Sequence, residues 1–277
     1  MSAKISVISL ISYDASFLPR SIASYYDYVD EIILGLDENR ISWSGNKVSF
    51  DEDKLWDDLQ KLDIQGKRTV IEDNFHRSSN PVENDTHERN VLKEHCSHDL
   101  VLSFDADEIL VNAKEFFVDY LPLIEDRTDV ELMFTWYLLY KDIPEKNGYL
   151  IISDETRQHI FKKDIQGFSA NRKLHTYHYC RWTNAPKKLL SPLAILHYSF
   201  CRTDKELDDK INNFTHSVES KVDPFYAVQR SVNYDNYKEL LNFKTHGAGA
   251  QWPTLQFMSR DTMHEYLQQE ARLIYEN

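Results

Sequence analysis

The sequence predicts an α/β fold in which helices cover both faces of a mixed, mostly parallel sheet. Over the first 110 residues, short apolar runs alternate with segments of helical periodicity, which is the pattern of repeated β-α-β units. The apolar runs are nearly continuous, as expected of strands buried on both faces. Further strands and helices follow, and we expect the strands to extend the same sheet.

The first part of the chain has the pattern of four strands joined by three helices. The strands are predicted at residues 5–11, 31–36, 69–72 and 100–104. The first helix includes Leu18, the second is expected to begin with a capping box made by Ser49 and Glu52, and the third to open at Asp85. Because each strand is joined to the next through a helix, the strands should run parallel with right-handed crossovers.

The pattern changes after residue 110. A helix is expected to start at Asn112, and a capping box made by Thr203 and Glu206 predicts another. Strands are predicted at 130–140, 149–152, 159–162 and 194–200. The remainder is expected to be helical. We therefore divide the chain into residues 1–110, residues 111–215 as the second half of the same domain, and a helical C-terminal extension over 216–277.

Composition narrows the classes of function. The 277-residue chain has 16 Tyr, 14 Phe and 5 Trp, enough for a sizeable core, and a net charge of −13, which disfavours nucleic-acid binding and docking on anionic membranes. The three cysteines are widely spaced, which is typical of a reducing compartment. No signal peptide and no transmembrane segment are visible in the sequence. We expect a cytoplasmic protein.

The pair Asp105 and Asp107 is the most informative feature. It follows the apolar run 100–104 directly, at the strand end where open α/β sheets place their ligands. Two carboxylates two residues apart on a strand point the same way, and a divalent metal is the usual partner for such a pair. A second copy, Asp51 and Asp53, lies in polar surroundings and is expected to be a solvated helix start.

Three stretches together resemble the GT-A fold glycosyltransferases. They are ISVISLISYD (5–14), EIILGLDEN (31–39) and ERNVLKEHCSHDLVLSFDADEIL (88–110). The DADE sequence at 105–108 and the later segment 195–210 resemble one subgroup of the family 2-like enzymes. The resemblance is specific over residues 4–110, loose over 130–215 and absent beyond.

The resemblance implies a Rossmann-like α/β/α sandwich and a metal-dependent glycosyltransferase. Such an enzyme moves a sugar from a UDP- or GDP-sugar to a hydroxyl of a glycan or another acceptor, here with inversion, and uses Mn²⁺ or Mg²⁺ to stabilise the diphosphate leaving group. Residues 1–110 would then bind the nucleotide sugar, and residues 111–215 would form the acceptor side.

The resemblance also assigns site residues. Asp105 and Asp107 would hold the metal against the diphosphate, and His197 would be a further ligand unless it is simply a core histidine. Glu108 would support the metal site or be a solvated acid. The nucleotide would be bound by Tyr13, Asp14, Asp37, Arg89 and Asp105. For two of these residues a role other than nucleotide binding stays open: Asp37 could be a turn residue, and Arg89 could be a surface partner of Asp85.

The catalytic base has no clear signal in the sequence. An inverting transferase needs an acid to deprotonate the acceptor hydroxyl, and the candidates are Asp142, Asp154 and Glu155, with Glu155 preferred.

Two other classes of function stay open. A nucleotidyltransferase on a related sheet is one, although the loop after the first strand, residues 12–16, has no glycine. A non-catalytic carbohydrate-binding protein on a transferase fold is the other, because the motif expected to supply the base is missing.

Overall fold

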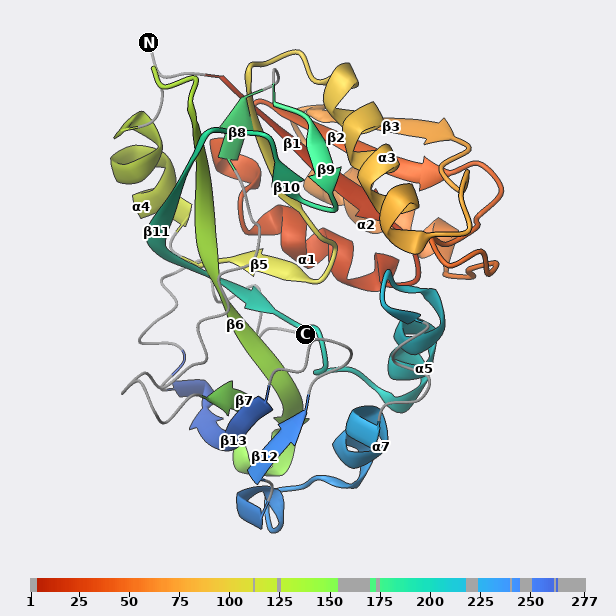
Figure 1. The fold of residues 1–277 in the computed structure, drawn as a ribbon, viewed down its shortest axis with the longest axis vertical. Helices are drawn as coiled ribbons and strands as arrows, with labels where there is room; N and C mark the ends of the chain where they lie inside the picture. Colours follow the sequence, from red (N-terminus) through yellow and green to blue (C-terminus); the bar gives the residue numbers. More distant parts are fainter. Residues whose placement is uncertain are drawn as a thin grey trace.

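The computed structural model describes residues 4–111, 113–123, 126–153, 170–172, 175–217, 224–239, 241–244, 251–261 and 263. These residues form one large mixed sheet flanked by helices, with a small two-stranded sheet beside it (Figure 1). All three cysteines lie in the described part of the chain, and none of them forms a disulfide bond there. None of the helices in these ranges is long and apolar enough to cross a membrane.

Four parallel strands in the order β3-β2-β1-β4 form the first part of the large sheet. The strands are β1 (Ile5–Ile11), β2 (Glu31–Asp37), β3 (Arg68–Asp73) and β4 (Leu100–Phe104). The helices between them are α1 (Leu18–Ala23), α2 (Glu52–Leu62) and α3 (Pro81–His95). The predicted α/β class and the four predicted strands of this part are confirmed.

Helices cover this parallel region on both faces. Val7 of β1 belongs to a buried cluster with Ile22 of α1 and Leu59 of α2. The next residue, Ile8, points to the opposite face and belongs to a cluster with Leu92 of α3. The alternation follows from the two-residue period of a strand. It produces three layers, with α1 and α2 on one side and α3 on the other (Figure 1).

The second part of the chain extends the sheet with antiparallel pairs. Its strands are β5 (Glu108–Leu110), β6 (Val130–Ile143), β7 (Gly148–Ser153), β8 (Ala170–Arg172), β11 (Lys187–His197), β12 (Leu241–Lys244) and β13 (Gln251–Ser259). Strand β8 pairs antiparallel with both β4 and β6 and so joins the two parts, while β11 runs parallel to β6. The small sheet contains β9 (Tyr177–Tyr179) and β10 (Trp182–Thr183). The strand predicted at 159–162 lies outside the described residues.

The helices that the structure describes in this part of the chain are short. They are α4 (Ala113–Glu115), followed by a π-helical turn and a 3₁₀ turn, then α5 (Asp204–Asn213) and α7 (Pro224–Ser231). Helix α5 has the predicted capping box: the Thr203 hydroxyl accepts from the Glu206 amide, and the Glu206 carboxylate accepts from the Thr203 amide.

Three local expectations are corrected. Helix α2 is capped by Asp51, whose carboxylate accepts from the Lys54 amide at 2.9 Å, and not by Ser49. Helix α3 begins at Pro81 behind the cap Asn80, four residues before Asp85. The C-terminal region is helical in α7 but also supplies β12 and β13, because β13 finds a pairing partner in the buried strand β7.

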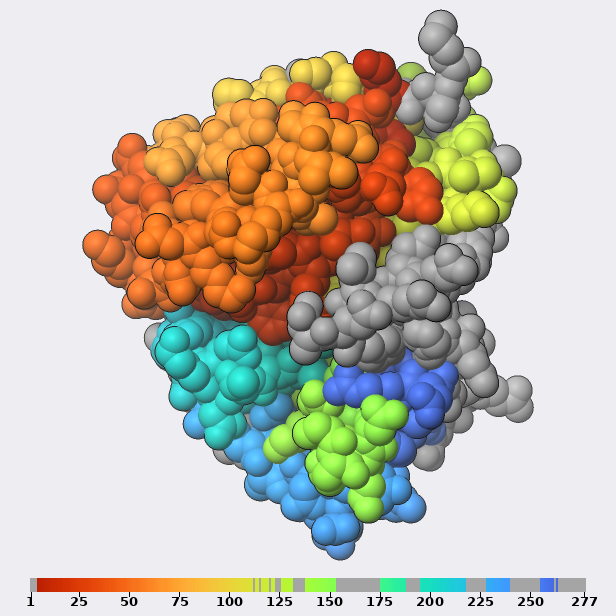
Figure 2. Space-filling view, turned by 180° about the vertical axis from the view of Figure 1, so that it is seen from behind, coloured from red at the N-terminus to blue at the C-terminus, as the bar shows by residue number. Residues whose placement is uncertain are grey.

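Helix α5 lies against the N-terminal part of the chain. The Ser44 hydroxyl donates to the carbonyl of Phe214 at 2.8 Å, and the Asn46 side-chain amide donates to the carbonyl of Asn212 at 2.7 Å. Figure 2 shows the cyan segment that contains α5 directly below the red and orange N-terminal layers. This packing brings the inner face of α5 toward the carboxyl ends of the parallel strands.

Candidate functional site

The candidate site lies where β1 and β4 end. These strands pair in parallel, with Ile5 opposite Leu100 and Ser9 opposite Phe104, so their carboxyl ends meet at one edge of the sheet. Strand β1 leads into Asp14, and β4 leads into Asp105 and Asp107. Asp14 is 5% exposed and Asp107 3%. Three carboxylates from two separate segments are thus gathered at the place where such sheets bind ligands.

Strand pairing carries His197 to this edge. Strand β5 begins at Glu108, directly after the acidic pair, and runs antiparallel to β11 with His197 opposite Glu108. The Tyr198 amide donates to the Asp107 carbonyl at 3.0 Å. His197 Nε2 consequently lies 3.4 Å from Asp107 Oδ1. The backbone register therefore brings together two residues that are 90 positions apart in the sequence.

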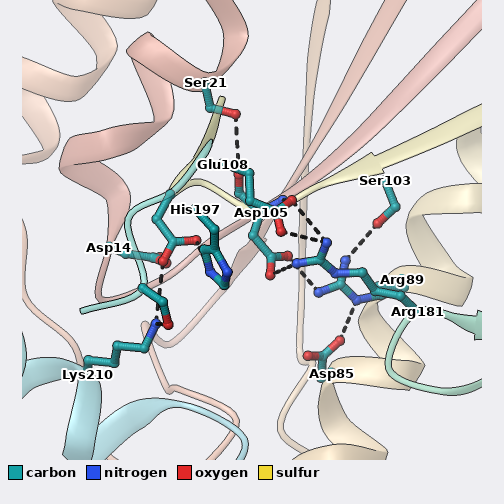
Figure 3. A network of polar contacts seen from close by, with 12 residues as sticks. Asp14, Ser21, Asp85, Arg89, Ser103, Asp105, Glu108, Arg181, His197 and Lys210 are labelled. Atoms are coloured by element: carbon teal, nitrogen blue, oxygen red, sulfur yellow. Dashed lines mark hydrogen bonds and ion pairs between the residues drawn. The ribbon is translucent and has the colours of Figure 1, made fainter. Parts of the chain in front are cut away.

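Two buried arginines hold the Asp105 carboxylate. Arg89 of α3 donates to Oδ1 at 2.8 Å, and Arg181, from the turn between β9 and β10, donates to Oδ2. Arg89 is itself fixed by Asp85 at 2.5 Å and by the Ser103 hydroxyl at 2.7 Å. Figure 3 shows both arginines on one side of Asp105, with His197, Asp14 and Lys210 on the other.

These arginines also set the charge of Asp105. Burial acts to raise the pKa of this carboxyl, but the positive charges of Arg181 and Arg89 outweigh it and hold the pKa at about 2. Asp105 is therefore ionised at neutral pH. Both of its oxygens already accept from guanidinium groups.

Glu108 stabilises the loop that contains Asp105 and Asp107. Its side chain is fully buried, and both carboxylate oxygens accept from Arg181 Nη1, at 2.8 and 2.9 Å. Oε2 also accepts from the Asp105 amide at 3.0 Å. Burial is the main cause of its raised pKa. Of the two expectations for Glu108, the solvated acid is wrong, because the side chain is an internal tie between the loop and Arg181.

Asp107 is held by cations from the second part of the chain. Its Oδ2 accepts from Arg202 Nη2 and lies 3.4 Å from Lys210 Nζ, while Oδ1 faces His197. The Lys210 ammonium is also fixed by the Ser199 hydroxyl at 2.9 Å. Burial acts to raise the pKa of Asp107, but His197, Lys210 and Arg202 together hold it well below its ordinary value.

Asp14 lies behind this group. Its Oδ2 is 3.8 Å from Arg202 Nη2. Burial, with the nearby charge of Asp107, raises the pKa of Asp14 to about 7. The guanidinium of Arg202 also lies over two aromatic rings, at 4.6 Å from the centre of Phe17 and 5.8 Å from that of Tyr13. Tyr13 is therefore placed at the site and packs edge-on against Trp43.

Two predicted residues have other partners. The Asp37 carboxylate accepts from three backbone amides, those of Asn39 and Ile41 at 2.9 Å and of Phe75 at 3.0 Å. It thus fixes the loop after β2, as the turn-residue alternative expects. Asp142 lies on β6, and both of its carboxylate oxygens accept from Arg260, at 2.8 and 2.9 Å.

The other base candidates, Asp154 and Glu155, lie outside the described residues. Arg89 is paired with Asp85 as one alternative expected, but this pair is buried and not on the surface.

The donor atoms of Asp107 and His197 fit a divalent metal better than Asp105 does. In the described ranges no group of three His, Cys, Asp or Glu side chains is arranged to hold a metal ion. The Asp107 and His197 atoms, 3.4 Å apart, form a pair of mixed oxygen and nitrogen donors. Mg²⁺-class ions are commonly bound by one or two protein ligands, with waters and substrate phosphates completing the shell. Such a pair suits a metal that arrives with a diphosphate.

Sequence reasoning missed three cations of the site: Arg181, Arg202 and Lys210. Lys210 had a detectable signal, because it follows the buried Leu207 by three positions and so lies on the inner face of α5. Arg202 follows the buried segment 195–201 closely. Arg181 had no local signal, since its position depends on the turn between two very short strands.

Comparisons with known proteins find similarity only among solved structures. No protein-family model matches the chain, and no curated protein matches it. Residues 1–349 of TarS from S. aureus, solved in complex with UDP-GlcNAc, have 18% identity and a TM-score of 0.34 over 49% of this chain. GalNAc-T7, solved with UDP, GalNAc and Mn²⁺, has 13% identity and a TM-score of 0.44 over 86% of this chain.

The chain spans 35% of the TarS chain and 53% of the GalNAc-T7 chain. The activities and ligands of those longer proteins are therefore not established for this chain.

Proposed function

We propose that this protein is a metal-dependent glycosyltransferase that uses a nucleotide diphosphate sugar. The observation that carries the proposal is the convergence of Asp107, His197 and Lys210 at the carboxyl edge of β1 and β4. A carboxylate and an imidazole suit a divalent metal, and a buried ammonium beside them suits phosphate oxygens. These are the groups needed where a diphosphate leaves an anomeric carbon.

The residues around this point have separable tasks in the proposal. Asp107 and His197 hold Mn²⁺ or Mg²⁺, which supplies Lewis-acid stabilisation of the departing diphosphate when bound. Arg202 and Lys210 donate to the phosphate oxygens. Arg89, Arg181 and Glu108 keep the loop of Asp105 and Asp107 in place through the hydrogen bonds described above. Tyr13 and Asp14 line the nucleotide side.

The acceptor side belongs to the same proposal. The sugar passes to a hydroxyl, most simply that of a glycan, with inversion, and a carboxylate removes the proton of that hydroxyl. Of the candidates, Asp142 is held by Arg260, and of the remaining two, Asp154 and Glu155, we prefer Glu155 as the base. We assign residues 1–110 to the donor, 111–215 to the acceptor side and 216–277 to a C-terminal extension, and place the protein in the cytoplasm.

A thermal-shift screen of UDP- and GDP-sugars, with and without Mn²⁺, tests the proposal. We expect one nucleotide class to raise the melting temperature, and to do so only together with the metal. A nucleotide sugar that raises the melting temperature equally with and without Mn²⁺ would contradict the proposed metal site. Release of pyrophosphate from a nucleoside triphosphate would favour the nucleotidyltransferase. Binding of a glycan without binding of a nucleotide would favour the carbohydrate-binding protein.

Turnover of the donor identified in this screen gives the second test. Asp107→Asn keeps the shape of the side chain and removes its charge. We expect it to lower turnover by about a hundredfold or more, because it weakens the binding of the metal and so the stabilisation of the diphosphate by that metal. Asp53→Asn, in the second acidic copy at the start of α2, is the matched control and should leave turnover unchanged. Full activity of Asp107→Asn would overturn the assignment.

A further inference from the structure

The acids of the candidate site are almost fully matched by cations that belong to the protein. In the part of the chain that the structure describes, four cations contact the acids of this network: Arg89, Arg181, Arg202 and Lys210. The acids that they contact number five: Asp14, Asp85, Asp105, Asp107 and Glu108. A free divalent cation that enters this site therefore finds little uncompensated negative charge.

Lys210 is placed to oppose a free metal ion directly. Its ammonium is 3.4 Å from Oδ2 of Asp107, the same carboxylate whose Oδ1 faces His197. The side chain is 6% exposed, so water screens its charge poorly. A metal held by Asp107 and His197 would share one carboxylate with this ammonium, and the two positive charges would repel each other.

Arg202 adds a second positive charge and an unused donor. Its side chain is fully buried, and one terminal nitrogen, Nη2, donates to Asp107. The other, Nη1, is buried without a hydrogen-bond partner among the described residues. A buried guanidinium with an unsatisfied N–H favours an anion, because leaving the donor unpaired costs free energy. The site thus has donors for an anion beside the two candidate metal ligands.

From this arrangement we infer that Lys210 couples the two ligands of the site, by disfavouring the metal ion alone and favouring it together with a diphosphate. The diphosphate of a nucleotide sugar is doubly negative and the metal doubly positive, so the pair enters a nearly balanced site without adding net charge. Lys210 then has a phosphate oxygen to bind, and its repulsion of the metal is offset. This inference rests on the proposed function, since it takes the diphosphate to be that of the donor.

The experiment compares wild-type protein with Lys210→Met, which keeps the length of the side chain and removes its charge. Binding of Mn²⁺ alone is measured by the electron paramagnetic resonance signal of the free ion. Binding of UDP and of GDP is measured by calorimetry in the presence of saturating Mn²⁺. We expect Lys210→Met to bind Mn²⁺ about tenfold more tightly and to bind the preferred nucleotide about tenfold more weakly.

Opposite signs for the two ligands distinguish this role from a structural one. A substitution that only destabilises the fold would weaken the binding of both Mn²⁺ and the nucleotide. Lys210→Arg keeps the charge and should change both affinities less than Lys210→Met does, and Lys205→Met, the same change at an exposed position of α5, should alter neither affinity. Circular dichroism of each variant confirms that it is folded before binding is measured.

The inference is overturned if Lys210→Met binds Mn²⁺ no more tightly than the wild type, or binds the nucleotide equally well. Failure of the proposed function gives a different result: neither nucleotide binds the wild type, with or without the metal. The Mn²⁺ measurement still decides in that case whether Lys210 opposes a metal at Asp107.

Discussion

Glu88 is an unusually placed acid at the residue scale. It is 3% exposed on α3, and its Oε2 accepts from the indole N–H of Trp43 at 2.7 Å. Its other oxygen is buried without a partner among the described residues. Burial raises the pKa of Glu88 from 4.5 to about 8. The folded protein consequently keeps a proton here at neutral pH, which the unfolded chain releases.

This proton makes the stability of the protein depend on pH. Between pH 4.5 and about 8, Glu88 is ionised only in the unfolded state, so the free energy of unfolding falls by up to about 1.4 kcal/mol per pH unit from this group. We expect Glu88→Gln to remove that dependence. Urea unfolding of both proteins at pH 5, 6, 7 and 8 measures the difference, in which the contribution of Asp14 cancels. Parallel curves would mean that Glu88 is ionised in the folded protein.

Single residues of the site were predictable only where local sequence marks them. Asp105 and Asp107 stand out because a fully apolar strand ends in them. Arg89 also lies in a recognisable helix, but its contact with Asp105 depends on how α3 packs across the sheet. Arg181 is positioned by pairing in a two-stranded sheet, a non-local property that periodicity does not encode.

At the scale of elements, β2 and α3 approach each other closely at Gly35. A Cβ added at this glycine would lie 2.4 Å from Glu88 Oε1 and 2.9 Å from Leu92 Cδ1. Such contacts are too short for carbon, so the helix or its side chains would have to move. The residues displaced include the neighbours of Arg89, which binds Asp105. The absence of a side chain at this position thus allows α3 to reach the site.

Gly35→Ala is therefore expected to destabilise the protein by about 1–3 kcal/mol through overpacking. The free energy of unfolding in urea, followed by circular dichroism, measures the loss. Glu88→Ala provides the background for a control, because shortening that side chain removes the closest contact. Gly35→Ala should cost less there than in the wild type. An equal cost in both backgrounds would show that the contact with Glu88 does not cause the loss.

The elements were predictable in proportion to how local their stabilising contacts are. Strands β1 to β4 are short apolar runs between helices, and each was predicted with nearly correct bounds. Strand β13 packs on β7, about a hundred residues earlier in the chain, and β8 inserts antiparallel between β4 and β6. Pairings of this kind are decided by the assembled sheet, so a helical pattern was inferred for residues that form part of it.

At the scale of the whole molecule, Asp107 connects two distant parts of the chain. It belongs to the loop after β4, whereas Arg202 and Lys210 belong to the region around α5. All three side chains are buried, at 3%, 0% and 6% exposure. A buried charge without its partner is strongly unfavourable. The carboxylate is therefore expected to stabilise the docking of α5 in addition to any role toward a ligand.

Asp107→Ala should consequently lower the free energy of unfolding by roughly 3–5 kcal/mol, because two buried cations lose their partner. Lys210→Met alone should also destabilise the protein, since Asp107 then keeps fewer donors. In the Asp107→Ala background the same change should have the opposite sign, because it removes a buried ammonium that has lost its counter-ion. Urea unfolding of the two single variants and the double variant completes this cycle. If Lys210→Met destabilises the protein equally in both backgrounds, the ammonium is stabilised by Ser199 and its other surroundings, and Asp107 joins the two parts of the molecule through Arg202 alone.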